Sequence, residues 1–183
     1  MPSYPYVYES PTASVIDIDS AKEWLRIDRG VTADDLTISQ ALESAIDSVE
    51  QDIGASLRPT VYEWNTSCFP GPIPTRLISE ITSVEYFDGT DYVALPVESY
   101  RLIRTGQHSH KLAYTDISDL TYERREDTIR VRFIAGYATP PPGLLQAVRA
   151  RLGDFYDNRG DGVAEKKTLS DKLTDKYRLP YVG

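Results

Sequence analysis

The 183-residue chain is poor in the residues that most often carry cross-links or redox chemistry. It has one cysteine, Cys68, which excludes a disulfide within the chain, and a lone thiol is more often a small apolar residue than a nucleophile. No run of roughly 18 apolar residues is present, so no membrane-spanning helix is predicted. The N-terminal MPSYPYVYES also lacks the basic and apolar regions of a secretion signal. We therefore expect a protein made in the cytoplasm, with no membrane contact.

Motifs for cofactors and metals are also missing. No GxxxxGK[ST], GxGxxG or GxSxG occurs, and these are the usual signatures of nucleotide binding and of serine hydrolases. The two histidines, His108 and His110, have no third ligand at zinc-site spacing, which favours a solvated loop. The stretch Gly160–Gly162 resembles a calcium loop only superficially, because Arg159 stands where an oxygen ligand is needed. No cofactor and no metal are predicted.

Carboxylates gather in one part of the sequence, between residues 116 and 127. General acid or base catalysis needs a pair of such groups in a shaped pocket, which a sequence cannot reveal. A charged hairpin surface is the favoured interpretation, and no catalytic residue is assigned. The acids concerned are Asp116, Asp119, Glu123, Glu126 and Asp127.

The net charge of -8 is unevenly distributed along the chain. Residues 1–60 hold 11 acidic and 4 basic side chains, whereas residues 144–183 hold 6 acidic and 8 basic ones. Non-specific DNA binding depends on many Lys and Arg contacts to phosphate, so this chain is a poor candidate for gripping nucleic acid. An acidic surface could nevertheless face DNA without binding it.

A short helix is predicted at about residues 20–29. Ser20 and Glu23 have the form of a capping box at its beginning. At helical spacing, three apolar residues can face inward: Ala21, Trp24 and Leu25.

The longest helix is predicted at about residues 32–54. Thr32 and Asp35 mark its beginning, and Gly54 is expected to end it. Its apolar residues form an inward stripe: Leu36, Ile38, Leu42, Ala45, Ile46, Val49 and Ile53.

A closing helix is predicted at about residues 143–158, after the three prolines Pro140–Pro142. Proline is tolerated where a helix begins, because the first N–H groups have no partner within the helix. Leu144, Leu145, Val148, Leu152 and Phe155 form the apolar stripe of this helix, and Arg149, Arg151, Asp154 and Asp157 are expected on the remaining surface.

Between the long and the closing helix, about residues 60–137 form a β-rich insertion. Its strands are expected near residues 61–68, 81–87, 92–95, 100–104 and 128–134, and FDGTDY contains an Asp-Gly hairpin turn. The predicted fold class is mostly α with a β insertion (α+β): an antiparallel helical bundle with a small β-sheet inserted between the long second helix and the closing helix.

Both ends of the chain are predicted to lie outside the central domain of residues 17–160. Residues 1–16, rich in Tyr, Pro and Ser, form an extended N-terminal arm, and residues 161–183 form a C-terminal tail with one short helix at most. Their tyrosines are expected at interfaces, because an arm has no core of its own in which to bury them. These residues are Tyr4, Tyr6, Tyr8, Tyr177 and Tyr181.

The order of these elements resembles a known family, the head-tail connector (adaptor) proteins of tailed double-stranded-DNA phages and gene-transfer particles. AKEWLRID and ALESAIDSVEQDIGASL resemble the opening helices of this family, and YEWNTSCFPGPIP and ITSVEYFDG resemble its first strands. VRFIAGY with the following prolines resembles the last strand, and LLQAVRARLGDFYDNR resembles the closing helix. The resemblance covers about residues 17–160 and includes no catalytic signature.

The resemblance implies a structural protein of the virion neck rather than an enzyme. Such a protein forms a ring of roughly twelve copies under the portal, extends the channel for DNA ejection, and offers a platform to a stopper or tail-terminator protein. Genomic DNA passes without sequence-specific binding. A ring of identical subunits needs contacts between two different faces of each copy.

The C-terminal tail is the hypothesised contact with the portal, because it combines basic and aromatic side chains. The residues proposed for this contact are Lys172, Lys176, Tyr177, Arg178, Leu179 and Tyr181.

Two alternatives remain open. The protein could be a tail-completion or stopper protein of the neck, which would have a similar mixture of helix and sheet. Alternatively, it could be an assembly enzyme in which Asp116, Asp119 or Glu123 bind a metal. The long helix paired with the closing helix distinguishes an adaptor from an all-β stopper.

Overall fold

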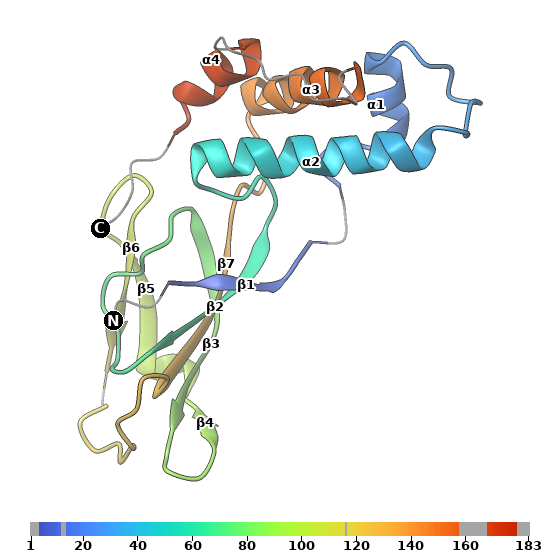
Figure 1. The fold of residues 1–183 in the computed structure, drawn as a ribbon. Coiled ribbons are helices and arrows are strands. Elements are labelled where there is room, and N and C mark those ends of the chain that lie inside the picture. Colours follow the sequence, from blue (N-terminus) through green and yellow to red (C-terminus); the bar gives the residue numbers. More distant parts are fainter. Residues whose placement is uncertain (1–3, 12–13, 116, 158–167, 179–183) are drawn as a thin grey trace. The chain divides into compact units, whose positions relative to one another are not determined.

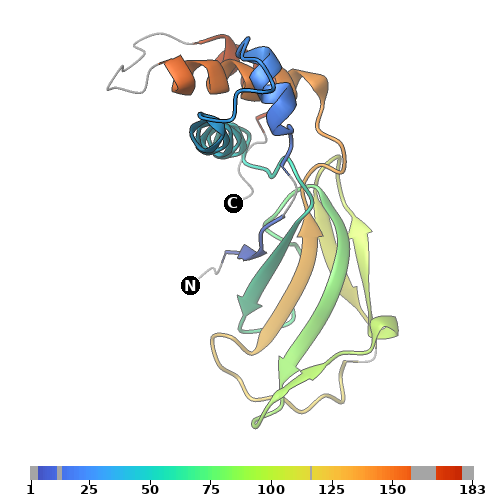
Figure 2. The same ribbon diagram turned by 90° about the vertical axis from the view of Figure 1, so that its right-hand side faces the viewer.

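The computed structural model describes residues 4–11, 14–115, 117–157 and 168–178, and these form two compact units. The helical unit contains the four helices, and its chain comes from Thr12–Arg58 and Ala138–Tyr181. The sheet unit contains the seven strands, and its chain comes mainly from Pro59–Tyr137 together with Met1–Pro11. Figures 1 and 2 show the elements of each unit from two directions.

The helical unit is built around two long antiparallel helices, α2 (Asp35–Ile53) and α3 (Pro142–Asp157). The short helices α1 (Ile18–Trp24) and α4 (Leu169–Asp175) pack against this pair at opposite ends (Figure 1). Among the described residues, no helix is long and apolar enough to cross a membrane. The buried core follows the predicted stripes and includes Ala21, Ile38, Leu42, Ala45, Ile46, Val49, Ile53, Leu144, Ala147, Val148 and Leu152.

The ends of the helices agree only partly with the sequence signals. Gly54 ends α2 in the left-handed conformation, with φ 67°, as predicted. The capping box predicted at Ser20 is wrong, because α1 begins earlier and Asp17 caps it by accepting a hydrogen bond of 2.8 Å from the Ser20 amide. Ser20 therefore lies inside the helix.

Three residues of the predicted inward stripes are exposed instead. Trp24, Leu36 and Phe155 all belong to apolar positions of the sequence pattern, yet each is at least 41% exposed. Lys22 of α1, by contrast, is only 2% exposed. The helical period predicts which apolar residues share a face, but the packing of the neighbouring helices decides which of those side chains are buried.

The sheet unit contains a five-stranded antiparallel sheet with the order β1-β2-β7-β3-β4. A two-stranded sheet of β5 (Tyr100–Arg104) and β6 (His110–Tyr114) accompanies it, and the short 3-10 helix η1 (Val97–Ser99) precedes β5. The strands of the larger sheet are β1 (Tyr6–Glu9), β2 (Thr60–Thr66), β7 (Ile129–Ala135), β3 (Ile78–Phe87) and β4 (Tyr92–Ala94).

The central strand β7 shows the predicted alternation. Ile129, Val131, Phe133 and Ala135 are buried, whereas the two arginines between them point to the opposite face of the sheet. These four residues share a core with Trp64, Ile73, Ile78, Val84, Leu95, Tyr100 and Leu112. The sheet unit thus has a hydrophobic core of its own.

The fold class predicted from the sequence is wrong in its proportions. The structure is a sheet-rich α+β fold, with seven described strands beside four helices, rather than a helical bundle carrying a small insertion. The physical reason is the separate core, because strands distant in sequence pair around β7 and bury their apolar faces together. A sheet with this core is an independent structural body, not an appendage.

Two of the strands carry little sequence signal. All four residues of β1 are exposed, so this strand shows no alternation of buried and exposed side chains. β6 begins at His110, in the segment interpreted as a solvated loop, and that interpretation is wrong for His110, which is half-buried and paired with Arg104. The Asp-Gly turn between β3 and β4 is confirmed, with Gly89 at φ 111° and the Asp88 carboxylate accepting bonds from the Thr90 and Asp91 amides.

Candidate functional site

The residues proposed for portal contact lie on α4 and directly after it. Lys172, Lys176 and Arg178 are exposed, and Tyr177 is half-buried. The other two, Leu179 and Tyr181, lie outside the described residues. The structure therefore brings three cations together on one short segment.

A capping box fixes the beginning of α4. The Thr168 hydroxyl accepts a 3.3 Å bond from the Asp171 amide, and the Asp171 carboxylate accepts a 2.8 Å bond from the Thr168 amide. This bond from the Thr168 backbone, helped by Arg151, lowers the pKa of Asp171. α4 is therefore a defined helix, although an isolated seven-residue helix would be unstable in water.

Arg151 of α3 connects α4 to the two long helices. Its guanidinium lies 3.0 Å from the Asp171 carboxylate and also pairs with Asp52 of α2. The Thr174 hydroxyl donates a 3.4 Å hydrogen bond to the same Asp52 carboxylate. Arg151 is only 11% exposed, so the sequence-based expectation of a surface position is wrong. The helical spacing of α3 could not reveal this role, because the covering element is a distant part of the chain.

Tyr177 packs where α3 begins. A Cβ atom placed on Gly143 would lie 2.9 Å from the Tyr177 hydroxyl, so the absence of a side chain makes room for the ring. The Lys176 ammonium lies 4.8 Å from the centroid of the same ring. The described part of the candidate portal contact is thus an ordered basic surface with an aromatic residue anchored beneath it.

A second candidate surface is the polar face of the five-stranded sheet. Arg130 and Arg132 of β7 lie between Glu63 of β2 and Glu85 of β3. Arg132 is 2.8 Å from Glu63 and 3.7 Å from Glu85, and Arg130 is 3.5 Å and 3.4 Å from the same two carboxylates. The two charges of each sign form a closed network across three strands.

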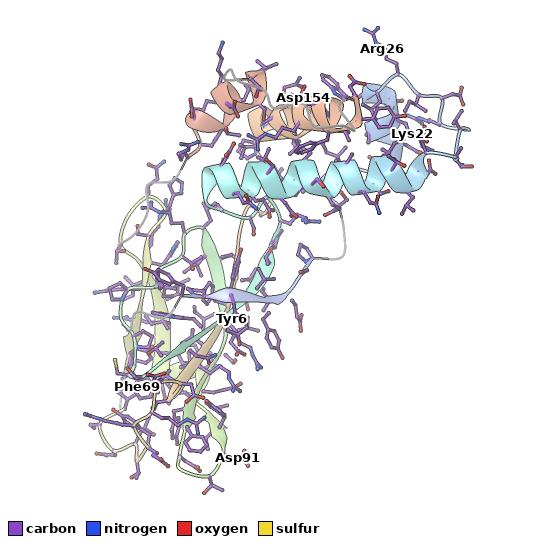
Figure 3. All side chains as sticks on the ribbon, in the orientation of Figure 1. Tyr6, Lys22, Arg26, Phe69, Asp91 and Asp154 are labelled. Atoms are coloured by element: carbon purple, nitrogen blue, oxygen red, sulfur yellow. The ribbon has the colours of Figure 1, made fainter. Side chains whose placement is uncertain are left out.

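Aromatic rings extend this network towards both edges of the sheet. The Arg132 guanidinium lies 4.3 Å from the Tyr8 ring centroid, and Arg130 lies 3.8 Å from that of Tyr92. The Tyr6 hydroxyl donates a hydrogen bond to Glu63. Figure 3 shows Tyr6 on the sheet unit.

The surroundings of Glu63 favour its charged form. Burial alone would raise its pKa, but the hydrogen bonds from Tyr6 and Arg132, with the charge of Arg130, lower the pKa below its ordinary value. The bond to Glu63 in turn raises the pKa of Tyr6. Because these arginines already have carboxylate partners, this face is poorly suited to binding phosphate.

The described residues of the enzyme alternative, Asp119 and Glu123, belong to no metal-binding cluster. Across the described ranges, no group of three or more His, Cys, Asp or Glu side chains could hold a metal ion. Asp119 and Glu123 are exposed, and Asp116 lies outside the described residues. The hydrogen bond from Arg125 holds the pKa of Asp127 well below its usual range, which fits a structural ion pair.

The histidines and the cysteine likewise show no shared site. The backbone carbonyls of His108 and His110 accept hydrogen bonds from the Leu77 and Ile73 amides, and these bonds connect the histidine segment to the segment before β3. Burial lowers the pKa of His110. Cys68 is exposed in a shallow hollow whose other lining residues are Ser67, Arg124, Arg125 and Glu126.

Comparison with known proteins finds likenesses at the level of the fold. No family model and no curated protein matches the chain. Solved structures do match it: a chain of the "Neck of empty GTA particle computed with C6 symmetry" aligns with a TM-score of 0.77 and 17% identity, covering 97% of this chain and 96% of that chain. The chain has the fold of a protein from the neck of a gene transfer agent particle.

Two further structures agree with this likeness. A chain of the "Virion of native gene transfer agent (GTA) particle" matches with a TM-score of 0.76 and 17% identity, over 97% of this chain and 96% of that chain. A chain of the "Neck of native GTA particle computed with C12 symmetry" matches with a TM-score of 0.70 and 16% identity, over 97% of each. At the level of the fold, the resemblance predicted from the sequence is confirmed.

Proposed function

We propose that the protein is a structural component of the neck of a phage or gene-transfer particle, where it forms a ring of about twelve copies. One observation carries the proposal: nearly the whole chain superposes on chains of neck structures determined with sixfold and twelvefold symmetry. The match includes both the helical and the sheet unit, since it covers 97% of this chain. A ring requires heterologous contacts that close on themselves.

Within the neck, we assign it the position of the head-tail adaptor. The ring lies under the portal, extends the DNA channel and carries a stopper or tail-terminator protein on its other side. Net charge supports a passive channel, because -8 per copy disfavours the phosphate binding that would hold DNA in place. The pairing of Arg130 and Arg132 with carboxylates supports the same role.

Electron microscopy of the purified protein mixed with its cognate portal ring tests this proposal. We expect a second ring stacked on the portal, with matching rotational symmetry and an open channel. Portal rings that stay bare at concentrations well above micromolar would overturn the adaptor assignment.

The portal contact is assigned to the C-terminal segment that begins with α4. A triple charge reversal, Lys172→Glu, Lys176→Glu and Arg178→Glu, should weaken portal binding about tenfold or more, because all three exposed cations change sign. Charge reversal keeps the contacts of Asp171 and Thr174 inside the helical unit, which deletion of residues 163–183 removes. It gives up the Arg178 bond to the Asp52 carbonyl and the Arg178 ion pair with Asp175.

The matched control changes three cations elsewhere, Arg101, Arg104 and Lys111, which are also exposed but belong to β5 and β6. This control should bind the portal like the wild type. Equal binding by the α4 variant and the wild type would remove the C-terminal segment from the portal contact.

A stopper or tail-completion role is the weaker candidate. The paired helices α2 and α3, joined by the Tyr156 hydroxyl bond of 3.0 Å to Asp34 and by the Arg151 contacts, are a feature that an all-β stopper lacks. If the microscopy showed bare portals while the protein bound an already assembled neck, the stopper role would replace the adaptor role.

A further inference from the structure

Large apolar side chains that remain exposed are concentrated in two places. The arm patch comprises residues on or beside β1, all between 46% and 54% exposed: Tyr4, Tyr6, Val7 and Tyr8. The helical patch comprises residues of the helical unit between 41% and 72% exposed: Trp24, Val31, Leu36 and Phe155. In the described part of the chain, the remaining cases are dispersed: Val93, Val97 and Leu169.

The members of the helical patch belong to segments that meet at one end of the unit. The Lys22 ammonium, 2.6 Å from the Asp35 carboxylate, joins α1 to the beginning of α2. The bond from Tyr156 to Asp34 brings the end of α3 to the same place. Figure 3 shows Lys22 on α1, at the end of the helices opposite α4. The three segments that carry Trp24, Leu36 and Phe155 are therefore fastened to one another.

The helical patch consists of large apolar side chains that the isolated fold leaves exposed. Trp24 and Phe155 continue the apolar spacing of α1 and α3, and Leu36 lies on the side of α2 away from its buried residues; no other part of the described chain covers these three side chains. Exposed clusters of this kind mark interaction sites more often than single exposed residues do. Large apolar side chains on helices that the chain itself leaves exposed therefore indicate burial against a partner.

The arm patch is also preorganised. β1 pairs with β2 through its backbone, and its tyrosines contact Glu63 and Arg132. Within the described residues, no strand pairs with the outer edge of β1. Tyrosine provides a large amphipathic contact at a small loss of conformational entropy when its position is already fixed.

We propose that the arm patch of one copy packs against the helical patch of the next copy around the ring. This inference rests on the proposed ring and names the surfaces that would close it. A closed ring needs two different surfaces on each chain, and this chain has two distinct exposed patches of the same apolar chemistry, one on each unit. Their aromatic residues, including Trp24 and the tyrosines, are of the types that dominate interface energetics.

Cysteine cross-linking tests the proposed pairing directly. In a Cys68→Ser background, one variant carries Val7→Cys in the arm patch, and another carries Phe155→Cys in the helical patch. The two proteins are mixed, assembled on the portal and treated with a short bis-maleimide. We expect covalent dimers in the mixture and none with either variant alone. The double variant V7C/F155C should give a ladder of covalent oligomers.

Each outcome of this experiment has a distinct meaning. Dimers from Phe155→Cys alone would reveal a twofold contact and would overturn the inference. Rings visible by microscopy without cross-linked dimers in the mixture would also overturn it, while leaving the neck ring intact. If wild-type chains formed no rings at all, the proposed function itself would fail.

A pair of matched substitutions provides an independent measurement. Leu36 and Val97 are each 72% exposed, but only Leu36 belongs to the helical patch. Leu36→Ser should raise the concentration needed for ring formation about tenfold, whereas Val97→Ser should leave it unchanged. Circular dichroism checks that both variants are folded. Equal assembly of Leu36→Ser and the wild type would count against the helical patch.

Discussion

The helical and sheet units both bury a charged residue, but for different purposes. In the helical unit, Lys22 reaches one carboxylate, Asp35, and the Arg29 carbonyl at 3.2 Å, and thereby fastens α1 and the following loop to α2. In the sheet unit, Glu63 meets two arginines and a tyrosine hydroxyl within strands that are already paired. The Lys22 contacts thus join secondary-structure elements, whereas the Glu63 contacts neutralise charges on the face of the sheet.

This difference separates two ways of building a particle component. The helices need long-range polar contacts because they come from distant parts of the sequence, such as Arg151 with Asp52 and Asp171. The strands are joined by backbone pairing, so their charged side chains are available to set the properties of the open face. Loss of a charge should therefore loosen helix docking in one unit, whereas in the other it should lower stability without detaching a strand.

The largest effect is expected from removing the centre of the sheet core. Phe133→Ala should lower the free energy of unfolding by about 3–5 kcal/mol, because Phe133 is fully buried and the cavity is closed on all sides. Urea denaturation followed by tryptophan fluorescence measures it. A loss below about 1 kcal/mol would mean that the sheet repacks around the cavity.

The next largest effect concerns Arg151. Arg151→Ala leaves Asp52 and Asp171 without their shared partner and should cost about 1–3 kcal/mol, less than a fully buried pair because both carboxylates are partly exposed. Hydrogen exchange should become faster at the α4 amides and stay unchanged in β7. Arg149→Ala, on the same helix, is the control. Unchanged exchange in α4 would contradict the assigned role of Arg151.

Acid should affect the sheet face through Glu63. The folded-state pKa of Glu63 is lowered, so its ionised form contributes stability above the ordinary value of 4.5, and this contribution is lost as the pH falls further. Glu63→Gln should flatten that part of the stability profile, measured by thermal unfolding from pH 6 down to pH 3. An unchanged acid slope in the variant would show that other carboxylates control it.

The smallest effect is expected at Gly143. Alanine there improves helix propensity but brings a Cβ within 2.9 Å of the Tyr177 hydroxyl, so stability should change by less than about 1 kcal/mol. Displacement of Tyr177 should nevertheless weaken portal binding. Titration of Gly143→Ala against portal rings measures this, and Gly153→Ala, where the nearest atom lies at 3.9 Å, is the control.

The sequence predicted the elements that have a strong internal period. The apolar stripe of α2, its end at Gly54 and the alternation of β7 are all properties of neighbouring residues. β1 and β6 were not predictable in this way, because short or exposed strands are recognised only by their partners. The size of the sheet was underestimated for the same reason.

Candidate surfaces were harder to predict than elements. Glu63 and Arg132 are 69 positions apart, and no local spacing connects them. Arg151 was expected on the surface, because its covering helix α4 lies beyond a long connection. By contrast, the cationic character of the C-terminal segment can be read from its composition. Its cations Lys172, Lys176 and Arg178 are exposed, as expected for charged side chains.

The pairing of β2 with β7 has a consequence for how such proteins diversify. Thr60, where the chain enters the sheet unit, is the register partner of Ala135, where the chain leaves it. Partners in neighbouring antiparallel strands have Cα atoms only about 5 Å apart, so the intervening segment begins and ends at adjacent points. Such a segment is a cassette: a different β domain with equally close ends could replace it by recombination, while α2 and α3 retained their connection.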